Sequence, residues 1–443
     1  MIKVITYGTY DLLHYGHIRL LKRAKELGDY LIVGVTADDF DKMRGKINVQ
    51  QSLMERIEAV KATGLADEII IEEYEGQKID DIQRLDVDIF TVGSDWKGDF
   101  DYLNEFCRVV YLDRTEGISS SEIREKNQTI SVGMVGDSVF LEKVLQESEY
   151  VNGVVIDGLC TNCRFDFANK AEGMRIVTQN YDELLEQVDA VYIRSFPDKH
   201  CKHIRKALEN EKNVLCELPL TLNGREVDEL MTLAKEKNVI FMPALKTAYA
   251  TAYDRLLLLI KSGIIGEVVS VDATCTSMRK DISNGVQNEW NGIYEWGPTA
   301  MLPVFQILGT GFLNDHFVVK YDRITGKDLF TKIDFLYSSA VASIKVGDGV
   351  KSEGELIISG TDGYVYVPAP WWKTDYFEVR YENPNNNKRY FYQLDGEGIR
   401  YELVAFARAV QTGNVIPYIS EDVAKAISQM MEKFAGKDGI VKI

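Results

Sequence analysis

The sequence predicts an α/β protein with a doubly wound parallel sheet, then a second parallel α/β domain, and then an α+β domain with an open, largely antiparallel sheet. Short β-branched runs alternate with helical patterns over residues 1–128, and this alternation restarts over residues 129–250. Long stretches with a period of two dominate residues 251–443. Strands separated by helices form parallel sheets covered on both faces, whereas period-two stretches form antiparallel sheets.

Length and charge narrow the classes of function. A chain of 443 residues exceeds the size of one hydrophobic core. Its 51 basic and 68 acidic side chains give a net charge of −17, which argues against nucleic acid as a partner. No apolar run approaches the ~20 residues of a membrane span, and no signal-peptide pattern precedes the first strand. Six cysteines are too few for a disulfide scaffold, so we expect a reduced, cytoplasmic protein.

The individual elements follow from local periodicity. In the first domain we predict strands at residues 3–7, 31–35, 69–71, 89–92 and 109–112, and helices at 18–27 and 53–63. In the second we predict strands at 132–135, 153–156, 190–193, 213–216 and 239–242, and helices at 140–147, 202–209 and 226–237. In the third we predict strands at 268–274, 328–337, 340–346, 354–358, 364–367, 377–381 and 390–394, and helices at 399–410 and 420–434.

A histidine pair follows the first strand and directly precedes the first helix. His14 and His17 are separated by Gly16, in a chain with five histidines. Doubly wound sheets bind ligands at this place, where the N–H groups of a helix N-terminus attract phosphate. Both rings can therefore face one phosphate, and Gly16 permits close backbone approach. Two unrelated surface histidines are the alternative, which the nearby Gly8, Thr9 and Asp11 disfavour.

Two further segments follow later strands of the same predicted sheet. Residues 114–124 read Arg-Thr-Glu-Gly-Ile-Ser-Ser-Ser-Glu-Ile-Arg after the fifth strand. Their hydroxyls can cap a helix or bind a triphosphate, and Arg114 supplies a cation. Residues 93–96 read Gly-Ser-Asp-Trp at the end of the fourth strand. The carboxyl ends of parallel strands share one edge, so these segments are expected near the histidine pair.

His14-Tyr15-Gly16-His17 together with residues 114–119 resembles the cytidylyltransferase family over residues 1–126. The resemblance implies transfer of CMP from CTP to a small polyol phosphate, which gives a CDP-polyol and pyrophosphate in teichoic acid or capsule synthesis. It further implies that His14 and His17 stabilise charge on the α-phosphate, and that Lys46 and Arg114 reach the triphosphate. Nucleotide contacts are implied for Tyr7, Gly8, Thr9, Asp11, Gly16, Asp95, Trp96, Thr115, Ser119 and Ser120. Mg²⁺ is expected on the phosphates of CTP, without assigned protein ligands.

One position departs from the family pattern. The family carries an arginine shortly before the third strand, where this chain has Gly64. Arg56 or Lys61 can compensate, and the identity of the polyol phosphate is therefore left open.

The second domain begins like a dinucleotide-binding fold. Taking Gly136 as the first glycine of the fingerprint, Ser138 and Leu141 occupy the other two glycine positions. Asp157 is expected to end the next strand, where an acid would contact a ribose. We interpret Gly136 and Asp157 as remnants of a cofactor site.

Several motifs here resemble the Gfo/Idh/MocA oxidoreductases, which implies a Rossmann-like half and a sheet half. The family's Glu-Lys-Pro reads Glu217-Leu218-Pro219 here, and its later histidine and aspartate positions hold Thr299 and Leu302. Leucine cannot move a proton. We therefore predict that this region neither binds NAD(P) nor catalyses a reaction.

Three functions remain to be compared. In the first, the chain is a cytidylyltransferase whose second region is a scaffold and forms a homodimer or larger homo-oligomer. In the second, that region instead senses a ligand or binds a partner. In the third alternative, a bifunctional enzyme also reduces a keto-sugar phosphate with NAD(P)H; Leu218, Thr299 and Ser138 argue against it.

Overall fold

The computed structural model describes residues 1–37, 49, 51, 53–73, 76–113, 129–162, 173–278, 290, 292–392, 394, 396–437 and 439–443. Lys46, Arg114, Thr115, Ser119, Ser120 and the side chain of Asp95 lie outside the described part. Contacts divide the chain into two compact units, Met1–Thr129 and Ile130–Ile443.

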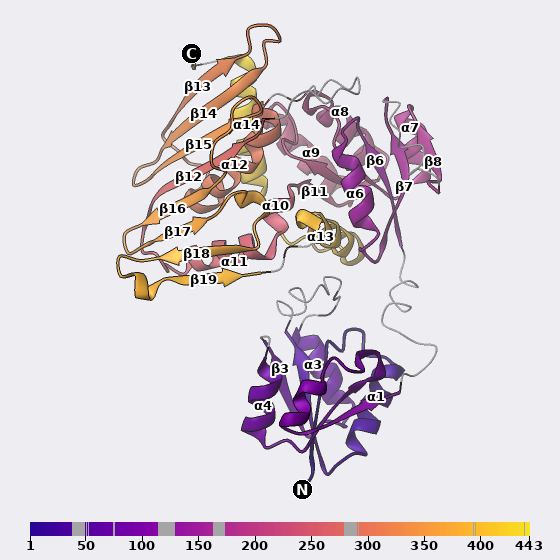
Figure 1. Cartoon of the computed structure of the whole chain (residues 1–443). Coiled ribbons are helices and arrows are strands. Elements are labelled where there is room, and N and C mark those ends of the chain that lie inside the picture. Colours follow the sequence, from indigo (N-terminus) through magenta and orange to yellow (C-terminus); the bar gives the residue numbers. More distant parts are fainter. Residues whose placement is uncertain are drawn as a thin grey trace. The chain divides into compact units, whose positions relative to one another are not determined.

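The first unit is built on a five-stranded parallel sheet with the order β3-β2-β1-β4-β5 (Figure 1). Its strands are β1 (Lys3–Gly8), β2 (Tyr30–Thr36), β3 (Glu68–Glu72), β4 (Ile89–Gly93) and β5 (Arg108–Leu112). The helices are α1 (Tyr15–Lys25), α3 (Leu53–Ala62) and α4 (Gln77–Leu85), with short turns η1 (Ser94–Trp96) and η2 (Asp101–Glu105). The predicted strands and both predicted helices are present within a few residues, and α4 was not predicted.

Helices cover both faces of this sheet. Val4 of β1 packs with Leu21 of α1 in one apolar cluster. Its neighbour Ile5 packs with Ile82 of α4 in a second cluster. Successive side chains of a strand point to opposite faces, so an uninterrupted apolar strand such as β1 supplies both cores. This is the doubly wound arrangement that the sequence predicts.

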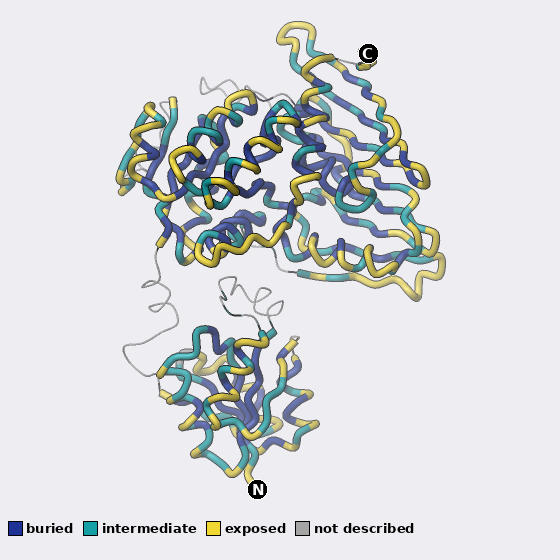
Figure 2. The backbone as a smooth tube through the Cα atoms, turned by 180° about the vertical axis from the view of Figure 1, so that it is seen from behind, coloured by how far each residue is buried: buried dark blue, intermediate teal, exposed yellow. Residues whose placement is uncertain are grey.

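The second unit begins with a six-stranded parallel sheet with the order β11-β10-β9-β6-β7-β8. The strands are β6 (Ile130–Val135), β7 (Val154–Cys160), β8 (Ile176–Thr178), β9 (Ala190–Ile193), β10 (Asn213–Glu217) and β11 (Phe241–Ala244). They alternate with α6 (Phe140–Ser148), α7 (Tyr181–Gln187), α8 (Pro197–Glu209) and α9 (Gly224–Lys237). Figure 2 shows the strands buried and the outer sides of the helices exposed.

A nine-stranded sheet completes the unit, with the order β19-β18-β17-β16-β12-β15-β14-β13-β20. Its strands are β12 (Val268–Thr276), β13 (Asn314–Tyr321), β14 (Asp328–Leu336), β15 (Val341–Gly347), β16 (Leu356–Gly360), β17 (Tyr364–Val367), β18 (Tyr376–Arg380), β19 (Lys388–Phe391) and β20 (Ile440–Lys442). β12 pairs with β15, and β13 with β20, in parallel, while the other pairs are antiparallel. The sheet is therefore mixed but largely antiparallel, as the sequence predicts.

Helices cover one face of this sheet. They are α11 (Thr251–Lys261), α12 (Gly292–Leu308) and α14 (Glu421–Gly436), while α10 (Lys246–Tyr249) and α13 (Ile399–Thr412) pack toward the parallel sheet. The turns η4 (Trp371–Lys373), η5 (Pro384–Asn386) and η6 (Gly396–Gly398) connect strands and helices. α12 was not predicted, and it contains Pro298 and Pro303. Packing between the elements of the two sheets joins both sheets into one compact unit.

Candidate active site

The carboxyl ends of β1 and β4 form the edge that carries the described site residues. β1 pairs with β2 on one side and with β4 on the other. The chain therefore runs from β1 to β2 and β3 on one side, and then crosses to β4 and β5 on the other side. Ligands of doubly wound sheets bind where the strand order reverses in this way. The segment that ends in His17 follows β1, and η1 follows β4. The fold thus brings two of the predicted segments to neighbouring strands.

The two histidines are fixed by the first turn of α1. His14 is the N-cap, and its Nδ1 accepts a hydrogen bond from the backbone N–H of Gly16 at 3.0 Å. The Nδ1 of His17 accepts from the backbone N–H of His14 at 3.5 Å, and the rings stack with centroids 3.9 Å apart. An Nδ1 that accepts a hydrogen bond carries no proton, so each neutral ring carries its proton on Nε2. The capping geometry therefore turns both Nε2 groups into donors.

Tight packing fixes the turn that precedes these histidines. Tyr10 and Leu12 have left-handed φ angles of 53° and 49°. Tyr10 is buried, and its ring meets the ring of His17 edge to face at a centroid distance of 5.5 Å. A Cβ at Gly8 would lie 3.0 Å from the Tyr10 ring. Residues held in this backbone region persist only where their surroundings determine them, and here Tyr10 supplies that packing.

A polar brace connects the turn to the start of α3. The Asp11 carboxylate accepts from the backbone N–H of Gln51 at 2.9 Å, and the Gln51 side chain accepts from the N–H of Leu12 at 2.7 Å. Asp11 is 1% exposed. Among the described residues, Asp11 thus acts on the backbone of the turn and positions the histidines, in addition to any contact with a nucleotide.

Arg56 completes this brace from inside the core. Its Nη1 donates to the carbonyls of Thr9 at 2.7 Å and Thr36 at 2.8 Å, and its Nε donates to the carbonyl of Gln51 at 3.1 Å. Arg56 is fully buried, whereas Lys61 is exposed and pairs with Glu58. Arg56 therefore holds the ends of β1 and β2 together. It acts as a positioning residue for the turn that follows β1.

A buried polar network lies beside the end of β1. The hydroxyl of Tyr7 donates to Asp81 of α4 at 2.9 Å, and burial, followed by the charge of Asp81, raises the pKa of Tyr7. Lys78 pairs with Glu72 and lies 4.7 Å from the centroid of the Tyr7 ring. Sequence analysis named Tyr7 but missed its partners. Their signal was the cluster of polar residues at the start of α4, which usually marks a solvated helix face.

The end of β4 contributes η1. Trp96 is 37% exposed, and its ring centroid lies 6.0 Å from that of the buried Phe100. The backbone of Asp95 belongs to the same turn. Trp96 therefore presents a partly exposed indole at the end of β4, the strand that pairs with β1.

The corresponding edge of the second unit is filled by its own side chains. Gly136 has a φ of 140°, and a Cβ there would lie 2.2 Å from the carbonyl oxygen of Arg194. The Arg194 Nε donates to Ser138 Oγ at 3.2 Å, and its guanidinium lies over the Phe140 ring at 4.4 Å. The loop after β6 and the end of β9 are thus in direct contact, and Arg194 lies across the start of α6.

Buried acids neutralise this arginine. Arg194 pairs with Glu295 at 3.0 Å and with Glu217 at 3.5 Å. Tyr192 donates to Glu217 at 2.5 Å, and Glu402 lies in the same cluster. Burial raises the pKa of both Glu217 and Glu402. Leu218, Thr299 and Leu302 are themselves buried, with exposed fractions of 2%, 7% and 0%.

Asp157 does not end its strand, and that expectation is wrong. β7 continues to Cys160, and its pairing with β6 shifts register between Val132 and Gly133. The Asp157 carboxylate accepts from Ser131 at 2.6 Å and pairs with Arg175 at 3.3 Å. Asp157 therefore lies inside the strand and is bound to neighbouring side chains.

Comparison with known proteins identifies the first unit. Residues 5–126 match the model of the family described as cytidylyltransferase-like. Glycerol-3-phosphate cytidylyltransferase of Bacillus spizizenii is 51% identical over 125 residues, which cover 28% of this chain and 96% of that protein. The chain belongs to the cytidylyltransferase-like family. The corresponding enzyme of Staphylococcus aureus is 48% identical over 130 residues, covering 28% of this chain and 95% of that protein. The chain is therefore a nucleotidyltransferase with a cytidylyltransferase-like first unit.

The second unit, which follows this cytidylyltransferase-like unit in the chain, has an oxidoreductase fold. Residues 130–245 match the model described as oxidoreductase family, NAD-binding Rossmann fold. Trans-1,2-dihydrobenzene-1,2-diol dehydrogenase of Xenopus tropicalis is 24% identical over 244 residues, covering 50% of this chain and 70% of that protein. A 3-ketoreductase from Actinomadura kijaniata, solved with NADP and TDP-benzene, has a TM-score of 0.62 at 18% identity, covering 71% of this chain and 99% of that one. That likeness establishes the fold.

Two properties concern possible binding partners of this cytidylyltransferase-like chain. Within the described ranges, no group of three or more His, Cys, Asp and Glu side chains is arranged to hold a metal ion. No helix among the described segments has the length and apolar character needed to cross a bilayer.

Proposed function

We propose that the first unit transfers CMP from CTP to a small polyol phosphate resembling glycerol 3-phosphate, and releases pyrophosphate. The observation that carries this proposal is the histidine pair, whose Nδ1 atoms both accept backbone N–H groups and whose Nε2 atoms are therefore donors. Identity of 51% to a glycerol-3-phosphate cytidylyltransferase over 96% of its length supports the substrate class. Such a product would serve polymer synthesis of the teichoic acid or capsule type in the cytoplasm.

The reaction is an in-line displacement at the α-phosphorus of CTP. A phosphate oxygen of the acceptor forms the new P–O bond, while the bond to the β-phosphate breaks and its electron pair leaves with pyrophosphate. The acceptor phosphate is already ionised, so no proton must be removed. Negative charge that develops on the α-phosphate oxygens is stabilised by the Nε2–H donors of His14 and His17, held in place before the reaction.

CTP enters this reaction as its Mg²⁺ complex. Mg²⁺ prefers oxygen ligands and commonly binds through nucleotide phosphates with one or two carboxylates. The described carboxylate nearest to the histidine turn, that of Asp11, already accepts a backbone N–H, so the phosphates would supply most ligands. Activity is expected to disappear in excess EDTA and to return with added Mg²⁺. Full turnover in EDTA would contradict this proposal.

The acceptor is tested by measuring pyrophosphate release. The full-length enzyme is incubated with CTP and, separately, glycerol 3-phosphate, glycerol 2-phosphate and ribitol 5-phosphate, with GTP as the nucleotide control. We expect turnover with CTP and a short polyol phosphate. Absence of turnover with all three acceptors would overturn the proposed reaction.

We propose that the second unit neither binds NAD(P) nor catalyses hydride transfer. Reduction of a carbonyl needs a proton donor within reach, and Leu218 and Leu302 cannot act as one. The hydroxyl of Thr299 is a very weak acid. Arg194 crosses the start of α6, where a dinucleotide would place its pyrophosphate, and its charge is already paired with acids. The described residues thus do not fit the cofactor.

This part of the proposal has a direct measurement. NADH and NADPH are titrated into the protein and followed by cofactor fluorescence, and keto-sugar phosphates are assayed for absorbance change. Micromolar binding with turnover on any such substrate would show an active dehydrogenase.

We also propose that the nine-stranded sheet mediates formation of a homodimer or larger homo-oligomer. Helices cover one face, while Leu336 and Val341, paired in register, are each 49% exposed on the other. Light scattering after gel filtration tests this, with a Leu336→Glu/Val341→Glu variant expected to be monomeric. A monomeric wild-type protein would contradict it.

A further inference from the structure

Three lysines from separate elements of the second unit converge on one carboxylate. Lys246 of α10 lies 2.5 Å from Glu397 Oε2. Lys143 of α6 and Lys373 of η4 each lie 3.2 Å from its Oε1. The three cations are distant in sequence, and only folding brings them together. Each carboxylate oxygen is thus occupied by at least one ammonium group.

The backbone around Glu397 is shaped for this contact. Gly396, Glu397 and Gly398 have consecutive left-handed φ angles of 56°, 54° and 94°. A residue with a side chain is strained in this backbone region and persists there only where its surroundings determine its conformation. A Cβ at Gly398 would lie 2.7 Å from the backbone oxygen of Lys246, so a glycine is required there. The conformation of residues 396–398 therefore places the Glu397 side chain against the lysines.

The charges in this cluster do not balance. Three ammonium groups pair with the single carboxylate of Glu397, and Glu217, a further carboxylate that acts on Lys246, is already paired with Arg194. The neighbouring Glu147 pairs with Arg400 at 2.5 Å. Burial lowers the pKa of Lys246, and although burial acts oppositely on Glu397, the lysines lower the pKa of that acid to about 2. The lowered pKa of Glu397 is the effect expected of an acid that contacts several cations.

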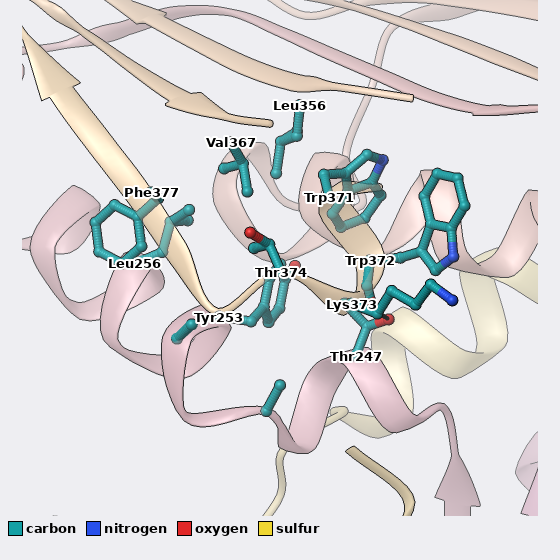
Figure 3. A pocket seen from close by; sticks show the side chains of 12 residues that line it. Thr247, Tyr253, Leu256, Leu356, Val367, Trp371, Trp372, Lys373, Thr374 and Phe377 are labelled. Atoms are coloured by element: carbon teal, nitrogen blue, oxygen red, sulfur yellow. Dashed lines mark hydrogen bonds between the residues drawn. The ribbon is translucent and has the colours of Figure 1, made fainter. Parts of the chain in front are cut away.

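An aromatic crevice adjoins the cluster. Lys373 and Trp372 lie on the same turn and line a crevice between α11 and strands β16–β18, together with Thr247 and Tyr253 (Figure 3). The Thr247 hydroxyl donates to the carbonyl of Trp372 at 2.9 Å, which fixes the turn against α10. A molecule that reached the lysines would have an indole face beside it.

We propose that Lys143, Lys246 and Lys373 form a binding site for a phosphate group, and that Glu397 is a built-in competitor occupying it. A phosphate monoester carries close to two negative charges and three terminal oxygens, one for each ammonium group. It would neutralise the charge that a single carboxylate leaves. The indole of Trp372 would pack against the carbon skeleton of a phosphorylated polyol or sugar. This site assigns ligand sensing to the second unit, independently of the reaction proposed for the first.

Binding is measured on the full-length protein with inorganic phosphate and, separately, glycerol 3-phosphate, with chloride at matched ionic strength as the blank. Four of the five tryptophans, Trp290, Trp296, Trp371 and Trp372, belong to the second unit, so tryptophan fluorescence reports on it. Glu397→Gln is expected to tighten binding about tenfold, because the competing carboxylate is gone. Lys143→Gln/Lys373→Gln is expected to weaken it about tenfold or more.

The matched control is Lys425→Gln, which removes an exposed lysine paired with Asp228 in the same unit and should leave binding unchanged. Tighter binding of glycerol 3-phosphate than of phosphate identifies an ester as the ligand, and equal binding identifies phosphate itself. If Glu397→Gln lowers the melting temperature, phosphate should restore it. The proposal is overturned if Glu397→Gln leaves affinity unchanged, if phosphate does not restore a lowered melting temperature, or if the double lysine variant binds normally.

Discussion

The two units place very different chemistry at the same edge of the same kind of sheet. In the first, the turn after β1 ends in two histidines whose Nδ1 atoms bind the backbone, which leaves Nε2 as the donor of each ring. In the second, the turn after β6 is crossed by Arg194, which is bound to Ser138, to the buried Glu217 and to the largely buried Glu295. In the first edge the backbone fixes the orientation of the two rings, whereas in the second edge the charged side chains pair with each other.

Both edges belong to parallel α/β sheets, so the sheet alone does not determine how the polar groups at the strand ends are paired. Function depends on whether the polar groups at the strand ends are already neutralised within the protein. A buried group satisfied by a neighbour contributes to packing, and a donor fixed by the backbone contributes to binding.

The largest expected effect tests the first edge. His17→Ala should lower kcat for pyrophosphate release by about 100-fold or more, the usual loss when one transition-state donor is removed. The melting temperature should fall only modestly, because the ring gives up one capping hydrogen bond and its contact with Tyr10. His316→Ala, at an exposed position of β13, is the control and should retain full activity. Near-normal kcat in His17→Ala would remove the functional contrast between the two edges.

The next test separates positioning from chemistry. Arg56→Ala removes three hydrogen bonds to backbone carbonyls and should destabilise the first unit by about 3 kcal/mol. Because the histidine turn loses its support, kcat should fall more than KM rises. Arg56→Lys should recover part of kcat, and Lys61→Ala, exposed on the same helix, should behave as wild type. Chemical denaturation and steady-state kinetics provide the measurements, and unchanged kinetics in Arg56→Ala would refute the positioning role.

The next prediction concerns how the stability of α12 depends on pH; this helix contributes Glu295 to the second edge. Asp328 accepts the N–H of Ile293 at the start of α12, and burial raises the pKa of Asp328 to about 7. Between pH 4 and 7 the folded state therefore holds a proton that the unfolded state has lost, so stability falls as pH rises through this range. Asp328→Asn should match wild type near pH 4 and be more stable by about 2–4 kcal/mol at pH 8. Denaturant unfolding from pH 4 to 8 measures this, and parallel curves for the two proteins would contradict it.

The smallest expected effect on activity is that of a substitution that restores a residue of the family pattern. Leu218→Lys restores the lysine of the Gfo/Idh/MocA pattern, yet no NADH-dependent turnover should appear, because Thr299, Leu302 and Arg194 are unchanged. The lysine is introduced at a buried position, so the melting temperature should fall. Appearance of dehydrogenase activity would show that a single side chain separates the two edges.

The sequence predicts best where a motif and its secondary structure lie together. His14 and His17 could be placed at a helix start because the apolar strand before them and the periodic helix after them are continuous. The role of Arg194 could not be predicted, since it depends on β9 pairing with β6 and on a glutamate contributed by α12. That helix was missed because Pro298 and Pro303 interrupt its pattern, although burial compensates for them.

Other differences arise from pairing between strands. The end of β7 was placed too early at Asp157, because a shift in register lets the strand continue through a charged residue. The parallel pairing of β12 with β15 has the same period-two signal as antiparallel pairing, so periodicity alone could not reveal it. The roles of all the site residues stay predictions, and Lys46, Arg114, Thr115, Ser119, Ser120 and the side chain of Asp95 also lie outside the described part.

The nine-stranded sheet ends on both sides in strands too short to template another. β19 spans four residues and exposes Lys388 and Arg389, while β20 spans three and exposes Lys442. A strand added at either border would gain few backbone hydrogen bonds and would meet the lysines Lys388 or Lys442. Growth by edge-to-edge pairing is therefore disfavoured at both borders of this wide sheet.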